Sequence, residues 1–268
     1  MQKATSSHTG QKMTLQGKAG TSRCIRLSSR RSELSITAAR GSEHALFITC
    51  GASARRFVVK IAVEPRAILA VVFMWKGKKR ANIAAHITVG AGGRFRLLNV
   101  THGSCVHKVV SEVSGRGGES FIDWIIHGRG TMKCLLSARN IFTAKNGRGD
   151  VIVRGVAEGD TKIVCHGSVE IGPKASGTQA HLTEKILVLD PTARVDVMPS
   201  LDVKTHDVSA SHSASISRIH PEDLFYFASR GILEKKARKL FIEGFLGSML
   251  EDMPEDELRK IAKTAPNE

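Results

Sequence analysis

The chain has 268 residues, of which 41% are hydrophobic and 24% are charged, a balance typical of a folded globular protein rather than a disordered one. Its formal net charge of +15 would attract an acidic partner or nucleic acid. No apolar run approaches the roughly 20 residues that span a bilayer, and the longest, Ala67–Trp75, suits a buried strand, so we expect no membrane association.

Residues 1–34 are predicted to form a basic N-terminal extension. Within the first forty residues, eight Lys and Arg residues face a single acid, Glu33. No aromatic residue lies between these cations to stack on nucleic-acid bases, so we favour a solvated extension. The alternative, a basic nucleic-acid-binding β-solenoid protein, stays open at this point.

Residues 35–217 repeat one theme, in which short apolar or alternating runs are separated by Gly, Asn, Asp or Ser. Runs such as Phe57–Val63, Ile83–Val89 and Val151–Val156 have the length of strands. The sequence therefore predicts an all-β core, which could be a sandwich, a barrel or a β-helix. The interior-type residues are mostly β-branched or small, which suits stacked flat rungs and favours a β-helix.

The pattern changes after residue 217, and residues 218–262 are predicted to form a small α-helical segment, with a tail at 263–268. Pro221 at the first helical position, acids in the first turn and Gly231 as a stop predict the first helix of this segment.

Two more helices are predicted in the same segment. From about Leu233 to Phe245, apolar residues recur at helical spacing among several cations. Pro254 then opens a shorter helix that runs through about Ala262.

The five cysteines are widely spread, odd in number and include no C-x-x-C pair. This pattern predicts reduced thiols rather than a disulfide framework, and it indicates a cytoplasmic protein. Cys105 and His107 alternate so that they share one face of a strand. Two such residues do not make a metal site, so we favour a structural role for both.

Enzyme chemistry finds little support in the sequence. A β-helix that cleaves carbohydrate needs paired acids and exposed aromatic platforms, and the chain has only two Trp and one Tyr. The glycine-rich stretch 115–118 is not followed by the Lys and Ser or Thr of a phosphate loop. We therefore expect no catalytic residue in this chain, and we expect any ATP to be bound by another chain.

The junction between the β core and the helices carries a family resemblance. The stretch from Pro199 through His212 to Ser215, Pro-Ser-Leu-Asp-Val-Lys-Thr-His-Asp-Val-Ser-Ala-Ser-His-Ser-Ala-Ser, resembles the segment of SufB and SufD proteins that precedes their C-terminal helices. The following Ser-Arg-Ile-His-Pro-Glu-Asp-Leu-Phe-Tyr, ending at Tyr226, and the later Ser-Arg-Gly-Ile are similar to that family's signature. The match is specific over roughly residues 165–246.

The resemblance to the SufB/SufD family implies a right-handed parallel β-helix followed by a small C-terminal α-helical segment. It also implies a scaffold role in iron–sulfur cluster assembly by the SUF system. The expected partners are a SufC-type ABC ATPase, docked on the helices at 218–262, and a SufB/SufD-type chain in a homodimer or heterodimer. A transient iron–sulfur cluster would form at the interface between the two scaffold chains.

The resemblance also assigns site residues. His212 matches the family histidine that is implicated in holding the cluster, and imidazole can replace a thiolate at an iron site. The cysteine that SufB places one rung earlier falls here on Thr183 or Glu184, depending on one gap. The thiolate is therefore missing, and the chain resembles a short SufD more than SufB.

The docking surface for the ATPase is predicted from the two helices at 221–245. Its candidate residues are Leu224, Phe225, Tyr226, Arg230, Gly231, Leu240, Phe241 and Phe245. Most of the apolar ones must form the seam between the helices, and the others would contact the partner.

Overall fold

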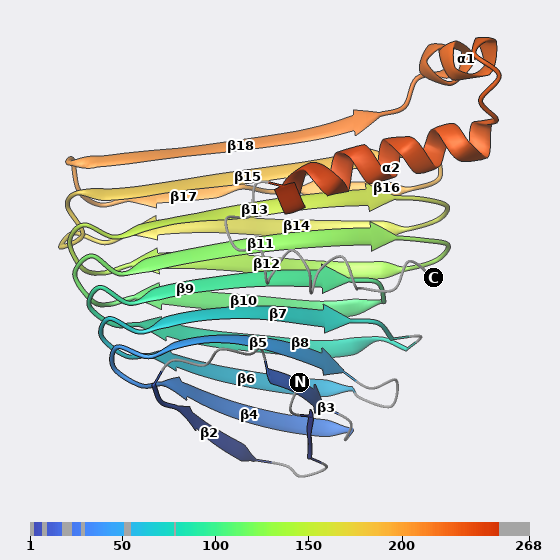
Figure 1. Ribbon diagram of the computed structural model, residues 1–268. Coiled ribbons are helices and arrows are strands. Elements are labelled where there is room, and N and C mark those ends of the chain that lie inside the picture. Colours follow the sequence, from blue (N-terminus) through green and yellow to red (C-terminus); the bar gives the residue numbers. More distant parts are fainter. Residues whose placement is uncertain are drawn as a thin grey trace.

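The computed structural model describes residues 3–6, 10–17, 23–27, 30–50, 55–77 and 79–251. The chain winds into a parallel β-solenoid of about 8 turns with two short helices at its C-terminal end, which confirms the predicted β-helix architecture (Figure 1). Strands alternate between two sheets, so that each coil contributes one strand to each sheet, and neighbouring coils pair in parallel.

Sheet A contains nine strands in coil order. They are β1 (Lys3–Ser6), β3 (Arg23–Leu27), β5 (Glu43–Cys50), β7 (Ile68–Trp75), β9 (Arg94–Thr101), β11 (Glu119–Gly128), β13 (Arg148–Ala157), β15 (Thr178–Val188) and β18 (Val208–Arg218).

Sheet B is built from the intervening strands. They are β2 (Gln11–Leu15), β4 (Arg31–Ala38), β6 (Arg56–Val63), β8 (Ala81–Val89), β10 (Cys105–Val113), β12 (Lys133–Phe142), β14 (Lys162–Ile171) and β16 (Arg194–Val197), with β17 (Ser200–Val203) also paired to β14.

The turns that lead from sheet B to sheet A share one conformation. Each has a residue with positive φ at the same place, at Gly41, Arg66, Gly92, Gly117, Asn146 and Gly177. The backbone N–H of each of the first five donates to a carbonyl oxygen in the turn of the next coil, as from Gly92 to Arg116 at 3.0 Å. These positions are 25, 26, 25, 29 and 31 residues apart, so the coils lengthen toward the C-terminus while the turn geometry is kept.

Strict alternation of side chains explains the solenoid interior. In β4 and β6 every second residue is buried and the residues between them are exposed or half-buried, as expected for strands with one face on a core. Inward residues of both sheets form one continuous apolar core. Its largest buried side chains include Trp75, Trp124 and Phe57.

The chain leaves the solenoid through β18 and forms α1 (Pro221–Ser229) and α2 (Glu234–Glu251). Pro221 lies in the first turn of α1, and the side chain of Asp223 accepts a hydrogen bond from the backbone of His220, 3.0 Å away. Gly231 ends the turn after α1 with a φ of 74°, as expected for a helix stop. The two predicted helices at 221–245 are therefore confirmed.

Three predicted boundaries differ from the structure or fall outside its described residues. The predicted start of the β core at residue 35 is wrong, because it falls inside β4, and β2 and β3 already pair with later coils. The charges of the first forty residues concealed the alternation of these strands, whose outward positions include Lys12, Arg26 and Arg31. The second helix extends beyond Phe245 to Glu251. The third predicted helix and the tail at 263–268 lie outside the described residues.

Candidate functional site at the open end of the solenoid

The last coil of sheet A forms an open end. β18 pairs along its whole length with β15, and within the part of the chain that the structure describes it has no strand on its other side. Of the ten residues from Ser209 to Arg218, all except Ala210 are exposed as a consequence. A strand edge with free N–H and C=O groups can pair with another chain.

His212 lies in the middle of this open edge. Its register partner on β15 is Leu182, which is 1% exposed and faces the core. Because in-register residues of parallel strands point to the same side of a sheet, His212 belongs to the inward row of the last coil. No further coil covers that row, so the imidazole is exposed.

The two residues at the position of the SufB cysteine point to opposite sides of β15. Thr183 faces outward, where its hydroxyl oxygen accepts a hydrogen bond from Ser213 on β18 at 3.3 Å. Glu184 faces the core and is 1% exposed. Alternation alone could have shown this, since Leu182 and Ile186 on either side of Glu184 are apolar and inward.

Glu184 is an unusual occupant of the core. A Cβ on Gly167 of β14 would lie 2.9 Å from one carboxyl oxygen, so this glycine leaves room for the carboxyl group. Neither oxygen has a hydrogen-bond partner among the described residues. Burial raises the pKa of Glu184 to about 7, and the nearby backbone of Gly167 opposes the rise only in part.

Three buried cysteines lie on neighbouring strands of sheet B, and Cys165 is the one close to Glu184. Burial, followed by the charge of Glu184, raises the pKa of the Cys165 thiol. The sulfur atoms of Cys105 and Cys134 lie 3.7 Å apart on neighbouring coils. Among the described residues, however, no three His, Cys, Asp or Glu side chains are placed to hold a metal ion.

Cys105 and His107 have a structural role in the core. Both are buried and inward on β10, and the ring of His107 packs edge-on against Trp124 with centroids 4.6 Å apart. Burial lowers the pKa of His107 to about 3, so the imidazole is neutral at physiological pH. The geometry agrees with the structural role expected for these residues.

The predicted docking residues divide into two groups. Phe225, Tyr226 and Leu240 are exposed by 74%, 57% and 41%, and Arg230, also exposed, lies over the Tyr226 ring. By contrast, Leu224, Phe241 and Phe245 are only partly exposed.

Phe241 and Phe245 contact the solenoid itself. Both pack against the cluster of Val156, Leu187 and Leu189 on the outer side of sheet A. They therefore belong to the seam between α2 and the solenoid. Leu233, which is not among the predicted docking residues, is 80% exposed in the turn between the helices.

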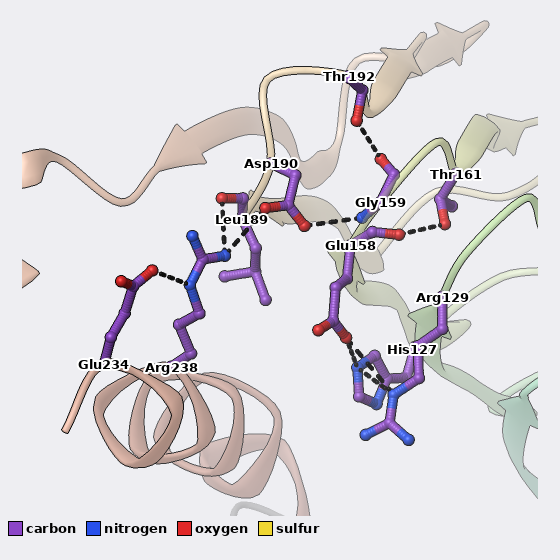
Figure 2. A network of polar contacts seen from close by, with 10 residues as sticks. All are labelled: His127, Arg129, Glu158, Gly159, Thr161, Leu189, Asp190, Thr192, Glu234 and Arg238. Atoms are coloured by element: carbon purple, nitrogen blue, oxygen red, sulfur yellow. Dashed lines mark hydrogen bonds and ion pairs between the residues drawn. The ribbon is translucent and has the colours of Figure 1, made fainter.

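A polar network fixes the start of α2 to the solenoid (Figure 2). Arg238 donates to the Asp190 carboxylate at 3.0 Å and to the Leu189 carbonyl at 3.2 Å, and it also pairs with Glu234 at 2.9 Å. The other oxygen of Asp190 accepts a hydrogen bond from the backbone of Gly159 at 2.7 Å. One carboxylate thus joins the helix to the turn of the preceding coil.

The network continues along the same edge of the solenoid. Glu158 lies 3.5 Å from both His127 and Arg129. Burial, with the charge of Arg129, lowers the pKa of His127 to about 4. Near the other end of α2, Arg154 of β13 donates to Ser248 and to the carbonyl of Phe245. The helix is therefore held at two places about ten residues apart, and sequence reasoning had no signal for either contact.

Comparison with known proteins agrees with this architecture. The family model described as "SUF system FeS cluster assembly, SufBD core domain" matches residues 6–245. The chain belongs to the SufBD family. The matched region begins near the first described strands and ends within α2, so the family domain includes both the solenoid and most of its helical end.

Several curated SufBD relatives are similar to the chain. An iron–sulfur cluster assembly SufBD family protein of Mycobacterium leprae is 29% identical over 214 residues, covering 75% of this chain and 55% of the relative. The iron–sulfur cluster assembly protein SufD of Bacillus subtilis is 28% identical over 158 residues, or 59% of this chain and 36% of SufD. The chain thus spans about half or less of the length of these relatives.

The SufBD chain shows no membrane-crossing helix in its described part. Neither α1 nor α2 combines the length and the apolar character that crossing a bilayer requires.

Proposed function

We propose that this SufBD family chain is a non-enzymatic scaffold subunit of a SUF-type iron–sulfur cluster assembly complex and works in the cytoplasm. The observation that carries the proposal is the open end of the solenoid, where β18 presents a free edge and an uncovered inward row. A site of this kind needs a second surface to become complete, which suits a scaffold rather than a self-contained enzyme.

The second surface is that of a SufB/SufD-type chain, either a second copy of this one or a different family member. Edge strands recruit partners by continuing the sheet with main-chain hydrogen bonds. The outward row of β18 is a ladder of serines at 209, 211, 213, 215 and 217, which adds hydroxyl groups but no charge that would repel a like surface. The inward row is mostly apolar and gains cover from the partner.

The cargo is a nascent iron–sulfur cluster at this interface. His212 supplies an imidazole that is accessible from the open end, and imidazole is a known replacement for thiolate at cluster irons. Of the two residues at the position of the SufB cysteine, Thr183 and Glu184, the latter offers a carboxyl group one coil deeper. Since the described residues of this chain bring no set of three ligands together, the partner chain contributes the remaining ligands.

A SufC-type ABC ATPase docks on the C-terminal helices and hydrolyses ATP. The exposed side chains of Phe225, Tyr226 and Leu233 form an apolar and aromatic surface on α1 and the turn after it, as is common at protein interfaces. Because Phe241 and Phe245 are engaged with the solenoid, α2 holds the docking surface in place instead of forming it.

Anaerobic co-expression with a SufC-type ATPase and a SufB/SufD-type chain tests the proposal. We expect a complex that carries iron and sulfide, and we expect His212→Ala to lower both without dissolving the complex. His206→Ala, which changes an exposed histidine in the turn before β18, is the matched control. Failure of the chain to form a complex with either partner would refute the scaffold role.

A second function, binding of nucleic acid, draws on one observation. Lys133, Lys162 and Arg194 stand in register at the start of three consecutive strands of sheet B, and like charges placed opposite each other are unfavourable unless an anion lies between them. Titration with a DNA duplex at two salt concentrations tests this function. An affinity that falls steeply with salt and is lost in the triple alanine variant would support it.

A further inference from the structure

The outward face of sheet B carries a row of apolar side chains that crosses three neighbouring coils. Val106 of β10, Leu135 of β12 and Val164 of β14 are partners in register, and each lies between two buried residues of its own strand. Leu135, at the centre of the row, is 37% exposed. The row is roughly 10 Å long from its first strand to its last, and Asp196, in register with Val164 on β16, marks its limit.

Basic residues stand on both sides of this apolar row. Two residues before it along the strands, Lys133, Lys162 and Arg194 are in register on β12, β14 and β16. Two residues after it come Lys108 of β10 and His166 of β14. All five side chains are exposed, so the row is an apolar strip between two basic margins.

The cations of these margins are not neutralised by the described part of the chain. Elsewhere on the same face, Arg139 pairs with Glu170 at 2.6 Å. No such ion pair within the described residues is formed by Lys108, Lys133, Lys162 or Arg194. Because like charges in register on neighbouring strands repel each other, the acids of a partner would relieve a repulsion that the free chain bears.

The spacing of the rows fits an α-helix laid across the strands. Successive coils are roughly 4.8 Å apart, and the apolar face of an amphipathic helix presents a side chain about every 5 Å along its axis. The two margins are four residues apart, from Lys162 to His166 on β14, which is roughly 13 Å. A helix with its side chains is roughly 10–12 Å wide, so it would lie on the apolar row with its two sides against the basic residues.

Nucleic acid fits the same surface less well. The outward positions of the described sheet B strands contain no Phe, Tyr or Trp, so bases would find no aromatic ring on which to stack. Phosphate groups would pair with the lysines but would leave Leu135 and its apolar neighbours facing water. An apolar strip between cations is instead complementary to a protein segment that has one apolar stripe and acids on both sides of it.

We propose that this part of sheet B docks an acidic amphipathic helix of another protein. We name the surface the sheet B patch and define it as Val106, Leu135 and Val164 with Lys108, Lys133, Lys162 and Arg194. The helix places its apolar stripe along the row and its acids beside the cations. The patch shares no residue with β18, α1 or α2, so this partner is additional to the scaffold chain and the ATPase proposed above.

Binding of a synthetic peptide to the full-length chain tests the proposal. The probe is a fluorescent peptide of about 18 residues, roughly 27 Å long as a helix, with Leu along one stripe, Glu on both sides of it and Ala elsewhere. A second peptide has the same residues in scrambled order, and a third has Gln in place of every Glu. We expect fluorescence anisotropy to detect binding of the first peptide and about ten-fold weaker binding of the other two.

Two variants of the patch locate the binding site. Leu135→Ser removes the central apolar contact and should weaken binding of the first peptide about ten-fold. Lys133→Gln with Lys162→Gln removes two charges and should weaken it about five-fold. Because these side chains are exposed, both variants should keep the midpoint of thermal unfolding close to that of the wild type.

Matched control variants lie away from the patch. Val203→Ser changes an apolar side chain on β17 that is 38% exposed. Lys174→Gln with Lys185→Gln removes the same charge from two exposed positions outside sheet B. Neither control should change the affinity for the first peptide by more than about two-fold, since salt screens charges at that distance.

Three results would overturn the inference. The first is no detectable binding of the ordered acidic peptide. The second is equal binding of the ordered and scrambled peptides with no effect of Leu135→Ser, which would show attraction by charge alone. The third is tighter binding of a DNA duplex that depends on Lys133 and Lys162 but not on Leu135, which would assign the surface to nucleic acid. None of these results bears on complex formation with the scaffold chain or the ATPase, which co-purification measures separately.

Discussion

Glu184→Gln should remove the pH dependence of stability that the buried carboxyl group imposes. Burial raises the pKa of Glu184 from its usual value of 4.5 to about 7 in the folded protein. The folded state therefore holds this proton more tightly than the unfolded state, and stability is full below pH 4.5 and is lost as the pH rises toward 7. Its neighbours in register, Val153 and Ala214, carry no charge.

The magnitude follows from the two pKa values. Each pH unit between them changes the free energy of unfolding by about 1.4 kcal/mol, so the wild type loses up to about 3 kcal/mol between pH 4.5 and 8 relative to Glu184→Gln. The glutamine keeps the shape of the side chain and cannot ionise. Cys165, the neighbouring thiol, has a raised pKa and remains protonated across this window.

Urea unfolding of both proteins at pH 5 and pH 8 measures the effect. We expect the stability of Glu184→Gln relative to wild type to increase by 2 to 3 kcal/mol at the higher pH, about the full linkage. Thr183→Val, on the outward side of the same strand, changes a hydroxyl group that does not titrate and should shift stability equally at both pH values. An equal difference between Glu184→Gln and wild type at both pH values would refute the reasoning.

Three more predictions concern the turns and the helices. Gly117→Ala should lower the free energy of unfolding by about 1 kcal/mol, because the φ of this residue is 67° and no atom lies near the added methyl group. Arg66→Gly, at the equivalent position of another turn, should raise the midpoint of urea unfolding. Arg238→Ala should speed proteolysis near residue 233 at least several-fold, because it removes the bonds between α2 and Asp190; unchanged cleavage would contradict the role of this network. Phe241→Ala should lower the midpoint of thermal unfolding by a few degrees. Phe225→Ala, which changes an exposed side chain, should leave that midpoint unchanged and weaken co-purification with a SufC-type ATPase. Equal effects of the two substitutions would contradict the division between seam and docking surface.

The sequence by itself determined the architecture and the family. Alternating or continuous apolar runs recur from Phe57 to Val156 because each coil needs one inward face and tight turns, and the strands that contain them are eight to ten residues long. The change to helical spacing after Pro221 marked the end of the solenoid correctly. The motif around His212 identified the SufBD family, which the match over residues 6–245 confirms.

The sequence alone could have predicted two further features of the structure. Alternation along β15 places Glu184 inward and Thr183 outward once Leu182 is known to be buried. The strands before residue 35 also alternate, but their outward cations resembled a solvated extension. In both cases the alternation with a period of two predicts which side chains face inward, and the charge or chemistry of individual residues obscured that alternation.

Only the tertiary structure decided which surfaces are covered. Phe225 and Phe241 have the same side chain on neighbouring helices, yet one is exposed and the other packs on Leu187. Val72 and Val110 both point away from the core, and only the former is fully buried. The physical reason is that periodicity reports which way a side chain points, whereas burial depends on segments distant in sequence that meet that side chain only after folding.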